Sequence, residues 1–208
     1  MRWLLFSVLS ITGCVNPDAD LQAFQRRLTR HVVADAGHDA AEGSACSIQP
    51  GDIAGRYLLA ISASIAPGRP ILALLDVSTP AAQDGAALAF VAQMLAASDR
   101  KTKVGDPLSL GPFPIDGDGD FHADITGLSV SGDANPVTLG APIEADLELT
   151  GNLCAKTRFY CGNVSGQIVR PLELSLQGST FTLTPIPPGS SVPDQPRIDC
   201  RGTLADPL

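Results

Sequence analysis

The chain has 208 residues, of which 44% are hydrophobic and 17% are charged, and its net charge is −8. The hydrophobic content excludes a disordered chain, and the negative charge, with no basic patch to offset it, excludes nucleic acids as partners. The 20 glycines and 17 prolines favour short strands and frequent turns over long helices. We therefore expect one β-rich domain with shorter segments at its ends.

Residues 1–13 have the pattern of a signal peptide. Arg2 is followed by an apolar run at 3–9, which is too short to cross a bilayer. The sequence ITGC at 11–14 then resembles the lipobox of bacterial lipoproteins, in which a small residue precedes the acylated cysteine. Ile and Thr stand where that pattern favours Leu and then Ala or Ser.

This resemblance implies a bacterial lipoprotein that is held on a membrane by a lipid on Cys14. Val15 follows the cysteine, where the inner-membrane retention signal of such proteins has Asp. The resemblance therefore implies an outer-membrane location, on a face that the sequence does not determine.

Residues 14–45 are predicted to be a spacer between the lipid and the folded domain. Apolar residues recur every three or four positions over 18–34, which favours a helix there. The rest of the spacer is small and polar, and we expect it to be loose. His31 and His38 are interpreted as surface residues.

From Gly55 onward, apolar residues alternate with polar or small ones, which is the period of a β-strand. The strand at 143–153 is the clearest, with one apolar and one acidic face. At Gly127 the alternation slips by one residue, which predicts a β-bulge. The alanine-rich segment 86–97 also fits a helix, but a strand is preferred because a helix would interrupt the series. Eight strands are predicted, beginning near residues 55, 69, 86, 103, 119, 141, 161 and 179.

Short turns between these strands predict an all-β, eight-stranded antiparallel meander. The edge strands of such a sheet expose unpaired backbone groups. The sheet can protect them by closing as a barrel, which we favour, or by folding into a β-sandwich. The first strand opens with Gly55-Arg56-Tyr57, which resembles the Gly-x-Trp opening of lipocalin-type barrels with Tyr in place of Trp. That resemblance implies an eight-stranded barrel, and we infer no binding residue from it. The domain is placed at 46–200, and 201–208 form a C-terminal tail.

Four cysteines remain besides Cys14, and in an exported domain they indicate two disulfides with three possible pairings. We favour Cys154–Cys161, because these residues lie at the two ends of one predicted hairpin loop. Cys46–Cys200 would then join the two ends of the domain.

Asp116-Gly117-Asp118-Gly119-Asp120 places three carboxylates at alternate positions. Aspartate and glycine favour a tight hairpin turn, which is our preferred interpretation. Asp116, Asp118 and Asp120 also match the first half of an EF-hand loop, so calcium is the alternative. The second half of that motif is missing.

Arg170 has the inward parity of its strand, between Ile168 and Leu172. A buried guanidinium needs an anion, which a ligand carboxylate or an internal Asp would supply. A position at the rim, or an outward turn at Pro171, stays open as an alternative.

The sequence favours a protein without enzymatic activity and without a cofactor. His122 has outward parity, and the acidic residues of 143–153 share one solvent face without a pocket. Two functions therefore remain. The preferred one is a structural or interaction domain of the cell envelope, with envelope proteins as partners. The other is a carrier that holds a small apolar ligand in its barrel, and an interior pocket of several hundred Å³ would favour it. The oligomeric state is not predicted.

Overall fold

The computed structural model describes residues 48–49, 51–82, 85–138, 140–155 and 157–208. Contacts divide the chain into two units, 1–44 and 45–208, and all the described residues belong to the second. The predicted signal peptide, Cys14, the spacer and Cys46 therefore lie outside the described residues.

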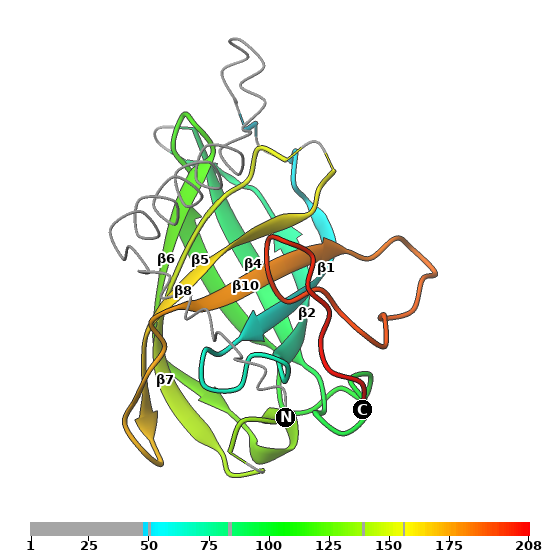
Figure 1. The fold of residues 1–208 in the computed structure, drawn as a ribbon. Helices are drawn as coiled ribbons and strands as arrows, with labels where there is room; N and C mark the ends of the chain where they lie inside the picture. The colour runs from blue at the N-terminus through cyan, green and yellow to red at the C-terminus, as the bar shows by residue number, and fades with distance from the viewer. Residues whose placement is uncertain (1–47, 50, 83–84, 139, 156) are drawn as a thin grey trace, which may run out of the picture. The chain divides into compact units, whose positions relative to one another are not determined.

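The described unit is all-β, as predicted (Figure 1). Its one helical element is a single 3-10 turn at Gly132–Ala134, and no helix among the described residues is long and apolar enough to cross a membrane. The strands are β1 (Gly55–Ser62), β2 (Ile71–Ser78), β3 (Ala81–Ala82), β4 (Gly85–Met94), β5 (Leu108–Pro114), β6 (Asp120–Val130), β7 (Ile143–Asn152), β8 (Tyr160–Arg170), β9 (Leu174–Ser175) and β10 (Ser179–Pro185).

The eight long strands form the predicted antiparallel meander, in the spatial order β5-β4-β2-β1-β10-β8-β7-β6. Each pairs with the next long strand along the chain, except β5 with β6, and the last strand returns to pair with the first. The segment at 86–97 contains β4, so the strand prediction is confirmed there and the helical alternative is wrong. The sequence did not reveal the two-residue strands β3 and β9.

The predicted closed barrel is wrong, and so is the sandwich, because the strands form one curled sheet that stays open between β5 and β6. Among the described residues, one bridge links the two sides of this opening, between Ile115, which follows β5, and Phe121 in β6, beside the connecting turn. Pro112 and Pro114 have no N–H to donate to a neighbouring strand, which restricts β5 to an edge. The predicted bulge at Gly127 interrupts the register of β6 and bends it. We call the open edge between β5 and β6 the seam.

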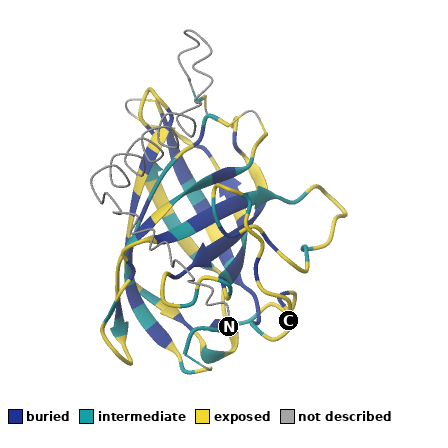
Figure 2. Ribbon diagram, in the orientation of Figure 1, coloured by how far each residue is buried: buried dark blue, intermediate teal, exposed yellow. Residues whose placement is uncertain are grey.

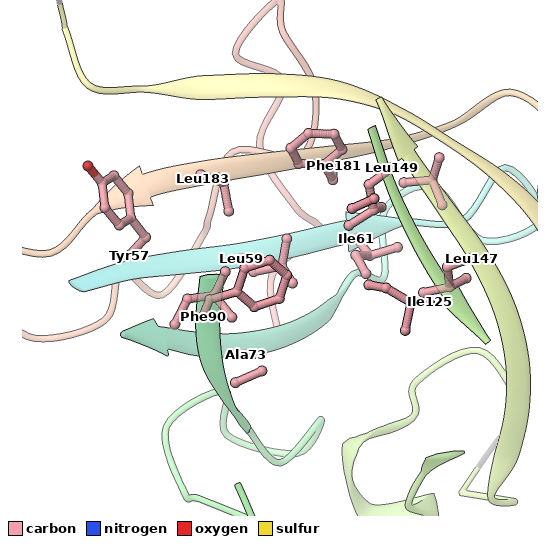
Figure 3. Packing of buried hydrophobic residues seen from close by; sticks show 14 of the residues in the cluster. Tyr57, Leu59, Ile61, Ala73, Phe90, Ile125, Leu147, Leu149, Phe181 and Leu183 are labelled. Carbon is pink, nitrogen blue, oxygen red and sulfur yellow. The ribbon is translucent and has the colours of Figure 1, made fainter. Parts of the chain in front are cut away.

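The concave face of the sheet holds the main hydrophobic core. Burial alternates along the strands (Figure 2), as β7 shows with buried Ile143, Ala145, Leu147 and Leu149 between half-buried acidic residues. Side chains from opposite walls face one another across this interior, for example Leu59 and Ile125 (Figure 3). The alternation that was read from the sequence therefore specifies which face of each strand is buried.

The convex face of β1 and β2 is buried as well, by the C-terminal segment. Ile186 and Val192 pack against a second apolar cluster that consists of Leu58, Ala60, Leu72 and Leu95. The hydroxyls of Thr180 and Thr182 donate hydrogen bonds of 2.7 Å to the carbonyl oxygens of Ile198 and Arg197. β1 is thus buried on both faces.

A disulfide joins this segment to the sheet, between Cys161 in β8 and Cys200, with 5.4 Å between their Cα atoms. The predicted pairs Cys154–Cys161 and Cys46–Cys200 are therefore both wrong. Cys154 is disulfide-bonded too. Cys161 lies opposite Thr182 in the ladder and shares its outward face, where the C-terminal segment passes. Its side chain therefore meets Cys200 instead of turning back toward its own hairpin loop.

We expect the double substitution Cys161→Ser with Cys200→Ser to lower the free energy of unfolding by up to about 4 kcal/mol. This is the loop-entropy value for a closed loop of this length, which spans a sequence separation of 39. Urea unfolding of the oxidised proteins measures the difference. Non-reducing peptide mapping of the wild type should yield a Cys161–Cys200 peptide, and a Cys154–Cys161 peptide would contradict the assignment.

Candidate functional site

The concave face holds an apolar cavity of about 50 Å³ that extends toward the seam. Leu108 and Leu110 of β5 and Leu128 of β6 line it on the seam side, and all three are half-buried. Four small residues in its wall leave the space unfilled: Ala63, Ala73, Ala92 and Ala145. Small inward residues therefore leave a cavity here.

This cavity is too small for a lipid chain or a drug-sized ligand. Ligand pockets usually measure about 300–1,000 Å³, whereas this cavity measures about 50 Å³. Its wall consists of Leu, Ile, Val, Ala, Phe and Met side chains, so no polar side chain is present to orient a head group. A water molecule would find no hydrogen-bond partner among those side chains.

Arg170 does not reach the interior, so of the positions that the sequence left open the structure shows the outward one. Ala145 pairs with Ile168, but Glu144 pairs with Arg170, which leaves Val169 as an extra residue in β8. Such a bulge reverses the alternation that follows it. The Arg170 side chain is 74% exposed, and its Nε lies 3.4 Å from a carboxylate oxygen of Glu144.

The acidic run forms the predicted turn between β5 and β6. Asp116 Oδ1 accepts hydrogen bonds from the backbone N–H groups of Asp118, at 3.0 Å, and Asp120, at 2.8 Å. The side-chain amide of Asn152 donates to Asp120 Oδ1 at 2.7 Å. Two of the three carboxylates therefore stabilise the hairpin, and calcium binding at this run stays a prediction.

Three polar side chains converge on the convex face of β6 and β7: His122, Asp124 and Glu148, which we call the outer trio. Nε2 of His122 lies 3.0 Å from Asp124 Oδ1 and 3.4 Å from Glu148 Oε1. Within the described ranges, no other group of three His, Cys, Asp or Glu side chains brings its ligand atoms within 4.8 Å of one another. The outward parity of His122 is confirmed. The trio itself was missed, because finding it requires the register that sets Asp124 opposite Glu148.

A second polar cluster, also missed from the sequence, joins Tyr57 in β1 to Arg158 and Tyr160. Arg158 donates from Nε to the Tyr57 hydroxyl at 3.2 Å and from Nη2 to the Ala54 carbonyl at 2.7 Å. Burial and, to a lesser extent, the neighbouring Tyr57 raise the pKa of Tyr160 to about 12. Arg158 borders an open surface depression of about 920 Å³, but its guanidinium already serves contacts within the protein.

Comparison with protein-family models, with curated proteins and with solved structures finds no match. A β-sheet architecture by itself hosts many functions. The function is therefore argued from the lipobox-like sequence, the interior and the outer face.

We expect Ala145→Val to raise the free energy of unfolding by about 1 kcal/mol, because added methyl groups fill empty apolar space. Ala145 lines the cavity. The matched control is Ala123→Val on the neighbouring strand, since Ala123 is fully buried but does not line the cavity. Overpacking should lower its stability by about 1–3 kcal/mol. Urea unfolding compares the two variants, and equal destabilisation would show that the cavity does not exist in solution.

Proposed function

We propose that this protein is an outer-membrane lipoprotein, anchored through Cys14, whose β-domain has a non-catalytic structural or interaction role in the cell envelope. The sequence ITGC after a short apolar run supports the anchor. The observation that carries the role of the domain is its nearly filled interior, with about 50 Å³ of empty apolar space.

The two strands at the seam offer a physical basis for interaction. Among the described residues, β5 pairs along its length only with β4, and β6 only with β7. An unpaired strand edge exposes backbone N–H and C=O groups that can pair with another chain. The prolines of β5 limit such pairing, which leaves β6 as the more continuous edge.

A carrier of small apolar ligands is the second candidate, and the position of the cavity favours it. The cavity is lined by half-buried apolar side chains of both seam strands, and among the described residues one bridge links the two sides of the seam. Separation of β5 from β6 would widen the cavity without breaking a continuous ladder. The small volume argues against this function, because a bound lipid would require that widening.

The anchor is tested with Cys14→Ser in the full chain. We expect the wild type to incorporate labelled fatty acid and to fractionate with the outer membrane, and the variant to do neither, because it lacks the thiol that is acylated. Val15→Asp is the matched variant that tests to which membrane the protein is sorted, and it should retain the lipidated protein in the inner membrane. An unlabelled wild type, or a Cys14→Ser protein that still fractionates with membranes, would refute the anchor.

The role of the domain is tested by titrating the Cys14→Ser protein with an uncharged apolar fluorescent probe, N-phenyl-1-naphthylamine. We expect no saturable binding, because the interior lacks the volume of a ligand pocket. Lipid extraction of the purified protein should likewise yield no stoichiometric lipid. Saturable binding near one probe per chain, weakened in Ala145→Val, would instead establish the carrier function.

A further inference from the structure

The outer trio has more acceptors than its imidazole can satisfy. His122 Nε2 carries at most one hydrogen, yet two carboxylate oxygens lie at 3.0 and 3.4 Å from it. Of the two contacts, only the one with Asp124 has the geometry of a hydrogen bond. We propose that His122, Asp124 and Glu148 form a binding site for a divalent transition-metal ion, with Zn²⁺ as its probe.

The spacing of the ligand atoms fits such an ion. Zinc binds imidazole nitrogen and carboxylate oxygen at about 2.0–2.2 Å in tetrahedral geometry, which separates two ligand atoms by about 3.3 Å. The distances from Nε2 to the two oxygens, 3.0 and 3.4 Å, lie on either side of this value. All three ligand atoms are within 4.8 Å of one another. Small rotamer changes therefore bring the trio to zinc-binding geometry.

The electrostatics of this face favour a cation. Asp124 and Glu148 lie directly opposite each other in the β6–β7 ladder, and like charges in that position are destabilising. Asp146 and Glu144 continue the acidic row along β7. Arg170 pairs with Glu144, but within the described part of the chain His122 is the one basic group paired with Asp124 and Glu148. A divalent ion would neutralise both carboxylates.

Ser165 in β8 holds Glu148 in a suitable orientation. Its hydroxyl donates to Glu148 Oε2 at 2.6 Å, and the other carboxylate oxygen, Oε1, faces His122. Ser165 and Glu148 are partners in the β7–β8 ladder. Ligating carboxylates are commonly fixed by hydrogen bonds of this kind. Three neighbouring strands therefore position the site on a rigid surface.

The donor set selects the class of metal ion. One imidazole with two carboxylates suits zinc and similar ions, whereas Ca²⁺ requires six to eight oxygen ligands. The side chains of His122, Asp124 and Glu148 are 50%, 73% and 43% exposed, so an ion can enter from solvent. With three protein ligands, the fourth position is left for water or for a group on a partner.

The experiment is a calorimetric titration of the oxidised full chain with Zn²⁺, repeated with Co²⁺ and followed by visible absorption. We expect one saturable site per chain. His122→Gln and Glu148→Gln should each weaken binding at least tenfold, and Ser165→Ala by about tenfold or more. Glu144→Gln is the matched control on the same strand and face, and it should bind within about twofold of the wild type.

The variants also separate this site from other sites. The spacer contains His31 and His38, so zinc binding that is unchanged in His122→Gln would place the ion elsewhere and overturn the proposal. If the wild type shows no saturable zinc binding, the proposal is wrong and the three side chains form only a surface ion pair. If Ca²⁺ binds instead, and is lost in Asp118→Asn but retained in Glu148→Gln, the acidic turn is the cation site and the trio is not.

Discussion

The ladder between β1 and β10 is the interaction on which the rest of this fold depends. It pairs Tyr57–Ser62 with the last long strand along the chain and so turns a linear meander into a curled one. β1 is buried on both faces, under the concave core on one side and the C-terminal segment on the other. Contacts of such large sequence separation form at a high entropic cost. The Cys161–Cys200 disulfide ties the segment that covers the outer face of β1 to β8.

Curling through β1 and β10 leaves the opening of the sheet at the seam, far along the chain from either end. A sheet with an apolar face has to bury that face. This sheet curls until side chains from its different strands pack against one another across the concave interior. The cavity remains where the walls carry alanine, on the side where Leu108 and Leu128 border the seam. The seam and the cavity thus have one cause: β5 can serve only as an edge strand, so the curled sheet stays open beside it.

Alternation in the sequence was enough to predict the long strands, because burial of one face imposes a period of two on every strand. It located the bulge at Gly127, where the phase slips visibly. The alternation did not reveal the bulge at Val169, because Leu172 and Leu174 continue the apolar pattern in the sequence. In the structure, Leu172 is 68% exposed. Three features were not predicted correctly: whether the sheet closes, which cysteines pair, and the outer trio. They depend on the register between strands or on the path of the C-terminal segment. Neither is encoded in a local pattern.

The convex face divides into two regions of different chemistry, and this division bears on where the protein acts. Over β1 and β2 it is apolar and already covered by residues of the same chain. Over β6, β7 and β8 it is acidic, and it carries the outer trio and the pair of Glu144 with Arg170. The interior offers apolar contacts without a polar group for specificity, whereas this face offers oriented charges on rigid strands. The interaction role that we propose is therefore better served by the outer surface and by the edge of β6 than by the interior.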